Sequence, residues 1–95
     1  MLRPRLNEST QSPAFAPDRQ RTRYLVVREE DVWFIKYDGE DYGPYISERE
    51  AMLFAVDAAQ KLGAQGEDTE VLRVDEHGGM TPAWSYGLDP FPPRL

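Results

Sequence analysis

With 95 residues, 40% of them hydrophobic and none of them cysteine, the chain has room for one domain with a small core, and disulfides, thiolate-bound metals and thiol catalysis are excluded. No stretch has the length and hydropathy of a signal-peptide core or a membrane span, so we expect a cytoplasmic protein without a membrane partner. The formal net charge of −6 combines +3 over residues 1–23 with −9 over residues 24–87, and so acidic a body makes nucleic acid an unfavourable partner.

The first 22 residues are predicted to form a disordered, basic N-terminal arm. Pro4, Pro13 and Pro17 interrupt a stretch rich in Ser, Thr, Gln, Asn and Arg that has neither helical nor strand periodicity. The arginines would attract an anionic partner, although such an arm is more often only a solvated tail. The candidate anion-binding residues are Arg3, Arg5, Arg19, Arg21 and Arg23.

A folded α+β domain is predicted over residues 23–87. Its first strand is expected from Tyr24 to Arg28, where β-branched and aromatic residues dominate. A second strand, VWFIKY, follows an acidic turn, and its side chains alternate between two faces. One face receives Trp33, Ile35 and Tyr37, and the other receives Phe34 and Lys36.

A tight hairpin is predicted at Asp38-Gly39. Both central positions of a type I′ turn need positive φ, which Asp and Gly tolerate well. The third strand is expected to run from Tyr42 to Ile46, and Gly43-Pro44 should bend or end it because proline donates no hydrogen bond.

Ser47-Glu48-Arg49-Glu50 predicts the start of a helix. Ser47 can cap the first turn by accepting from a backbone N–H, while the Glu50 side chain reaches back to the N–H of the serine. The helix is expected to run to about Leu62 and to stop at Gly63, because glycine adopts the left-handed C-terminal conformation easily.

The helical periodicity places small residues on the buried face of this helix and Leu53 on the polar side. Such small side chains imply a close approach of the helix to the sheet, so the strands must supply the bulk of the core. The face is predicted to carry Ala51, Ala55, Ala58, Ala59 and Leu62, flanked by Phe54 and by Met52 or Val56.

The last third of the chain predicts two more strands and a tail. EVLRV is expected to be a strand, DEHGG a turn, and MTPAWSYG an irregular strand that Pro82 confines to an edge of the sheet. Residues 88–95 are expected to form an extended, Pro-rich C-terminal tail, which Phe91 can pin to the domain. The predicted fold is therefore α+β, with a small antiparallel sheet, made of a three-strand meander plus a C-terminal hairpin, and one main helix packed across it.

The residues with chemical potential form no known catalytic or metal-binding set. His77 is the only histidine, whereas zinc sites usually take three or four protein ligands, mostly His or Cys. The carboxylates around Asp38 lack the spacing of a calcium loop, and no serine lies in a G-x-S-x-G elbow. We therefore expect no enzyme activity, no catalytic residue, no cofactor and no metal.

The aromatic residues allow two interpretations. The first is a non-enzymatic interaction module that binds a protein partner or forms a homodimer through its sheet edges or its C-terminal segment. The alternative is a nucleic-acid-associated protein that uses the arginine-rich arm and stacks bases on the sheet aromatics. The candidate interaction surface comprises Tyr42, Tyr45, Leu53, Trp84, Tyr86 and Phe91.

Several short motifs together resemble a small uncharacterised family of alphaproteobacteria, a domain of unknown function. They are W-x-I, G-P-Y, S-x-x-E-A at a helix start, an alanine-rich helix that ends at glycine, and W-x-Y-G-x-D-P-F-P-P. The likeness covers residues 24–93 and implies a compact α+β domain, but it implies no activity, cofactor or catalytic residue. The matching positions include Trp33, Ile35, Gly43, Pro44, Tyr45, Ser47, Glu50, Ala51, Gly63, and residues 84–93.

Overall fold

The computed structural model of the chain describes residues 21–95, so nearly all of the predicted arm, with Arg3, Arg5 and Arg19, lies outside the described residues. The described part contains five strands and one long helix. In chain order the elements are β1 (Thr22–Glu29), β2 (Val32–Tyr37), β3 (Glu40–Tyr45), α2 (Glu48–Ala64), β4 (Thr69–Val74) and β5 (Met80–Ser85).

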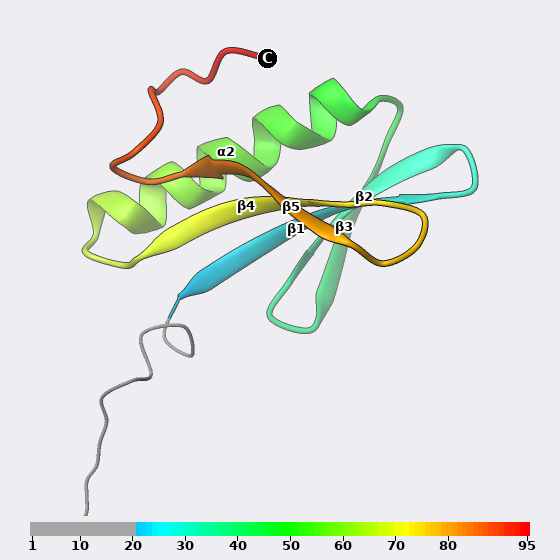
Figure 1. The fold of residues 1–95 in the computed structure, drawn as a ribbon, viewed down its shortest axis with the longest axis horizontal. Helices are drawn as coiled ribbons and strands as arrows, with labels where there is room; N and C mark the ends of the chain where they lie inside the picture. Colours follow the sequence, from blue (N-terminus) through cyan, green and yellow to red (C-terminus); the bar gives the residue numbers. More distant parts are fainter. Residues whose placement is uncertain (1–20) are drawn as a thin grey trace, which may run out of the picture.

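All five strands form one sheet in the order β3-β2-β1-β4-β5 (Figure 1). The predicted meander and C-terminal hairpin are both present as antiparallel pairs. The prediction of a purely antiparallel sheet is wrong, however, because β4 pairs with β1 in parallel. The cause is α2, which follows β3 and carries the chain back across the sheet, so that β4 runs in the same direction as β3 and β1.

The helix begins where the sequence predicts. Ser47 adopts an extended conformation and its Oγ accepts from the backbone N–H of Glu50 at 3.1 Å. The Glu50 carboxylate accepts from the N–H of Ile46 at 3.2 Å, one residue before the predicted partner. The cap therefore satisfies two donors, as expected, but with a shifted second bond.

The helix ends differently from the prediction. It continues through Gly63 to Ala64, and Gly66 has the left-handed φ of +104°. The N–H of Gly66 donates to Gly63 O, and the N–H of Glu67 donates to Leu62 O, which is a Schellman motif. Gly63 is instead buried inside the helix against the ring of Tyr86, where a side chain would not fit.

The hydrophobic core lies between α2 and one face of the sheet. The alternation predicted for β2 is confirmed, because Ile35 is buried in this core while Trp33 and Tyr37 pack against it. On the helix, Met52 and Val56 are fully buried, whereas Phe54 is 55% exposed on the side facing β3. The core cluster comprises Tyr24, Val26, Ile35, Ala51, Met52, Ala55, Val56, Ala59, Val71 and Trp84.

The segment after β5 returns on the same side of the sheet as α2 (Figure 1). Trp84, only 2% exposed, donates from Nε1 to the carbonyl oxygen of Pro90 at 2.9 Å. Its ring also meets that of Phe91 edge to face, with 6.5 Å between the ring centroids. The C-terminal segment thus covers Trp84, as predicted for Phe91, and adds to the layer formed by the helix.

Candidate functional site

An aromatic groove lies between α2 and the outer strands β2 and β3. It encloses about 340 Å³, and most of its lining is apolar. Phe54 and Tyr42 project into solvent beside it, with exposed fractions of 55% and 43%. The groove is lined by Tyr24, Ile35, Tyr37, Tyr42, Tyr45, Phe54, Ala55, Asp57, Ala58 and Lys61.

The hairpin between β2 and β3 brings these rings together. Asp38 and Gly39 both have positive φ, at +52° and +79°, as the sequence predicts for this turn. The resulting register places Tyr42 opposite Ile35, so its side chain lies on the helix-facing side of the sheet. Alanines at the facing positions of α2 leave the space that the rings line.

Two stacked pairs of rings form the walls of the groove. The centroids of Tyr24 and Tyr37 are 4.4 Å apart with an interplanar angle of 11°. Those of Tyr45 and Phe54 are 5.3 Å apart at 27°. The walls are therefore preformed, which lowers the entropic cost of binding a side chain between them.

Charged and ionisable side chains lie around the rim of the groove. Burial raises the pKa of Tyr24 to about 12, and the neighbouring Tyr37 contributes in the same direction. Desolvation and the nearby carboxylates of Glu40 and Asp38 also raise the pKa of Tyr42. Lys61 is engaged by Asp57 at 3.0 Å across one turn of α2. The rim is thus mainly acidic, which favours cationic groups beside an apolar ligand.

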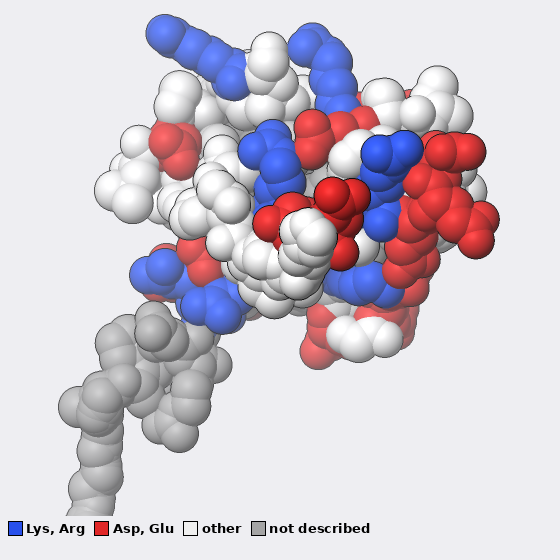
Figure 2. All heavy atoms as spheres, turned by 45° about the vertical axis from the view of Figure 1, so that its right-hand side comes forward, with Lys and Arg blue, Asp and Glu red and all other residues white. Residues whose placement is uncertain are grey.

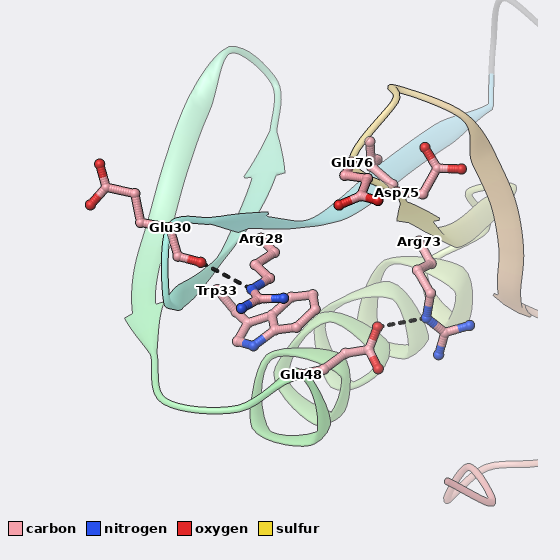
Figure 3. A pocket seen from close by; sticks show the side chains of 8 residues that line it. Arg28, Glu30, Trp33, Glu48, Arg73, Asp75 and Glu76 are labelled. Atoms are coloured by element: carbon pink, nitrogen blue, oxygen red, sulfur yellow. Dashed lines mark hydrogen bonds and ion pairs between the residues drawn. The ribbon is translucent and has the colours of Figure 1, made fainter.

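A second, larger cleft of about 560 Å³ lies at one end of the sheet beside the start of α2 (Figure 3). Both of its arginines have partners. Arg73 Nε lies 2.7 Å from Glu48 Oε2, and Arg28 Nε donates to the carbonyl oxygen of Glu30 at 3.0 Å. Trp33 lines this cleft next to its cross-strand partner Arg28. These contacts engage both arginines of the cleft, and they present no aligned acid and base.

Acidic side chains gather at the end of the sheet that carries the β1–β2 and β4–β5 turns. Figure 2 brings this end forward and shows red side chains along its right-hand edge, while blue and red ones alternate nearer the centre. The carboxylates in these two turns are those of Glu30, Asp31, Asp75 and Glu76. Such a surface repels phosphate groups, in agreement with the charge argument from the sequence.

The sheet face opposite α2 is covered by none of the elements in residues 21–95 (Figure 1). Cross-strand pairing places apolar residues of four strands on it, and Met80 is 57% exposed. A shallow hollow of about 220 Å³ also opens on this face, beside Leu25 and Met80. We call it the bare face; its apolar residues, of which Leu72 is only 6% exposed, are Leu25, Val27, Val32, Phe34, Leu72, Val74, Met80 and Pro82.

Charged residues flank the apolar part of the bare face. At one end the carboxylate of Glu70, itself 6% exposed, accepts from Arg23 at 2.8 Å and from Arg21 at 3.3 Å. Near the same end, level with Leu25 of β1, Lys36 lies between Asp41, at 3.0 Å, and Glu29, at 3.4 Å. Both signs of charge therefore flank the apolar residues, and the Lys36–Glu29 ion pair spans the face beside Phe34.

Two arginines of the predicted anion-binding arm, Arg21 and Arg23, form ion pairs within the domain. Arg21 contacts Asp68 in addition to Glu70, and these carboxylates raise its pKa. Both described arginines of the set are thus neutralised within the domain. The remaining three, Arg3, Arg5 and Arg19, lie outside the described residues.

The predicted interaction residues do not form one surface. Tyr42 and Tyr45 line the aromatic groove by β3, whereas Trp84, Tyr86 and Phe91 belong to the opposite edge by β5. Leu53 is exposed on the outer side of α2. The prediction that Trp84 is an interaction residue is corrected, because Phe91 and Pro90 of the same chain cover it.

The sequence interpretation missed the bare face. In β1, Leu25 and Val27 alternate with the core residues Tyr24 and Val26, so the strand is apolar on both sides. Such continuous apolar runs are typical of strands that are covered on both faces. The apolar runs Leu25-Val26-Val27 in β1 and Val71-Leu72 in β4 could have predicted this face.

Residues 21–95 also lack the features of a metal site or a membrane-spanning helix. No group of three or more His, Cys, Asp or Glu in this range is placed to hold a metal ion. His77 lies in the exposed β4–β5 turn, 3.7 Å from the carboxylate of Glu76. Within the same range, no helix combines the length and the hydropathy that crossing a membrane would require.

The chain matches no known family model, no curated protein and no solved structure. The resemblance to the alphaproteobacterial family therefore stays a prediction.

Proposed function

We propose that this protein is a non-enzymatic interaction module that pairs with a second copy of itself through the bare face of the sheet. The observation that carries the proposal is the apolar composition of both faces of one sheet, only one of which α2 covers. Leaving Val27, Phe34 and Met80 in water costs free energy that a facing sheet would recover.

The size of the bare face fits a dimer of modest affinity. Five strands about 4.8 Å apart, each of about six residues at about 3.3 Å per residue, project roughly 480 Å². The relief of the side chains raises the accessible area above this projection, toward the ~800 Å² that each partner buries in a standard interface. Two such sheets would pack about 10 Å apart, as in a β-sandwich.

The rim of the bare face is self-complementary. The β1–β4 side presents Arg21 and Arg23 around Glu70, and the β2–β3 side presents Lys36 beside Asp41 and Glu29. A two-fold axis places the same patch of each copy against the other, so a rim with both signs can align opposite charges.

The edges of the sheet are less suited to pairing than its face. In the edge strand β3, Pro44 donates no hydrogen bond, and the register of the pair shifts between Trp33 and Ile35. The other edge strand, β5, contains Pro82 and a second register shift. Prolines and irregular pairing at edges oppose the addition of a further strand. We therefore favour the face over the edges that the sequence suggested.

Sedimentation equilibrium tests the proposal directly. Over a series from about 10 µM to about 1 mM, which brackets modest affinities, the mass of the wild-type protein should rise from 10.9 kDa toward twice that value. Val27→Lys places a charge in the centre of the bare face and should keep the mass at 10.9 kDa.

Leu53→Lys is the matched control, because it introduces the same charge at an exposed apolar residue on the outer side of α2. It should associate like the wild type. Circular dichroism should show that both variants are folded. A wild-type mass that stays at the monomer value throughout the series, or equal association of Val27→Lys, would refute the proposal.

A further inference from the structure

The aromatic groove begins close to the point where the chain enters the described domain. Tyr24, which stacks on Tyr37 in the groove wall, lies three residues after Arg21, the first described residue. Thr22 fixes this entry, since its N–H donates to Asp68 O and its Oγ1 donates to Glu67. Whatever precedes Arg21 therefore starts within a few residues of the groove.

The C-terminal segment of the same chain shows how such a sequence can bind aromatic residues. Pro90 and Phe91 lie on Trp84, which donates a hydrogen bond to Pro90 O and meets the Phe91 ring edge to face. Proline-containing segments adopt an extended conformation with little loss of entropy, and aromatic-lined grooves are their usual receptors.

The N-terminal arm contains one segment of the same chemistry, Pro13-Ala14-Phe15-Ala16-Pro17. Phe15 is the sole aromatic residue of the first 20, and two prolines and two alanines flank it. Arg19 follows shortly after, so the segment combines an apolar ring with a nearby positive charge.

We propose that residues 13–17 occupy the aromatic groove of their own chain, with the ring of Phe15 beside Tyr42 and Phe54. The six peptide units from Phe15 to Arg21 span at most about 20 Å, which is enough to reach a groove that begins at Tyr24. This inference is independent of the proposed dimer, because the groove and the bare face lie on opposite sides of the sheet.

Charge and tethering both favour this occupant. The carboxylate of Glu40, beside Tyr42 at the groove, complements Arg19. A short tether also raises the effective concentration of the segment to the millimolar range, so weak contacts suffice. The arm is then a built-in occupant that any other ligand of the groove must displace.

Paramagnetic relaxation tests the inference on the full chain. The protein lacks cysteine, so Ser12→Cys accepts a single nitroxide label beside the segment. The NMR signals of Tyr42, Phe54 and Ala58 should lose intensity, whereas that of Leu72, on the bare face, should keep it.

The matched variants carry the same label. Phe15→Ala should restore the groove signals, and Leu6→Ala, which truncates an apolar residue elsewhere in the arm, should leave them attenuated. Phe54→Ala should weaken the attenuation at Tyr42, while Leu53→Ala on the outer side of α2 should not.

Three outcomes would overturn the inference. The first is attenuation spread evenly over the domain, and the second is attenuation that Phe15→Ala leaves unchanged. The third is attenuation of an unlabelled, ¹⁵N-enriched copy mixed with a labelled, unenriched one, which would assign the segment to the groove of a second copy. Sedimentation of the labelled protein would report separately on the proposed dimer.

Discussion

The same five strands form both faces of the sheet, but the two faces have different surroundings. On one face, an alanine-rich helix and the C-terminal segment bury Val26, Val71 and Trp84. On the other, Val27, Phe34 and Val74 stay partly exposed, because residues 21–95 include no second layer. The comparison teaches that apolar residues on both sides of a strand indicate that both faces of its sheet are to be covered. The covering element can come from the same chain or from another.

Polar groups also differ between the two faces. On the helix side, Thr69 is buried and its Oγ1 donates to Ala59 O at 2.8 Å, which ties β4 to α2. On the bare face, the carboxylate of Glu70 depends on two arginines that are themselves partly exposed. The helix side thus has a buried neutral hydrogen bond in addition to the Arg73–Glu48 ion pair, and the charged groups of the bare face form ion pairs that salt would screen.

The largest effect is expected for Trp84→Ala. This substitution removes a buried ring and uncovers the C-terminal segment, so the free energy of unfolding should fall by about 3 to 5 kcal/mol. Phe34→Ala on the bare face is the matched comparison, and at low protein concentration it should cost clearly less. Urea denaturation of both variants measures the difference, and equal losses would remove the distinction between the faces.

The next effect concerns the contact between α2 and the segment after β5. Gly63→Ala places a Cβ onto the ring atoms Cγ and Cδ1 of Tyr86, and overpacking of this kind costs about 1 to 3 kcal/mol. Tyr86→Ala in the same chain should recover most of that loss, because it removes the obstacle. A double-mutant cycle by urea denaturation would show strong coupling, and purely additive losses would contradict the packing described here.

The sequence predicted the local structure well where a single physical rule decides it. The Ser47 cap, the Asp38-Gly39 turn and the alternation of β2 depend on neighbours within a few residues, and all three are confirmed. Gly63 was misassigned because two glycines lie near the helix end. Only the contact with Tyr86, far away in the sequence, decides that Gly66 takes the left-handed position.

The candidate sites were less predictable, since they depend on tertiary placement. The sequence does not distinguish the surroundings of Tyr42 from those of Trp84. In the structure, Tyr42 borders a groove and Trp84 lies under Pro90. The parallel pairing of β4 with β1 was also hidden, because it follows from the path of α2 and not from either strand. Without it, the apolar residues of four strands could not be assigned to one common face.

A smaller effect is expected at the start of the helix. Ser47→Ala removes the acceptor for the N–H of Glu50 and should lower the free energy of unfolding by about 1 kcal/mol. Ser47→Asp preserves an acceptor and should retain most of the stability in the same denaturation experiment. An Ala variant as stable as the wild type would mean that the cap contributes nothing.

The last effect should appear only at alkaline pH. Burial raises the pKa of Tyr24 from 10.0 to about 12, so the folded protein keeps a proton that the unfolded chain releases. The stabilisation is complete below pH 10 and is lost as the pH rises to about 12. The midpoint of urea denaturation should therefore fall over this interval by less in Tyr24→Phe than in the wild type. An identical pH dependence of the two proteins would be inconsistent with a buried hydroxyl at this position.

We propose that one face of the sheet packs on the protein's own core and that the other packs on a second copy. An isotope-filtered NOE experiment on a mixture of labelled and unlabelled chains tests this most directly. The account predicts intermolecular NOEs from the methyl groups of Leu25, Val27 and Val74, and none from the core residue Ala55. Intermolecular NOEs confined to β3, β5 or the outer side of α2, or their complete absence at millimolar concentration, would contradict it.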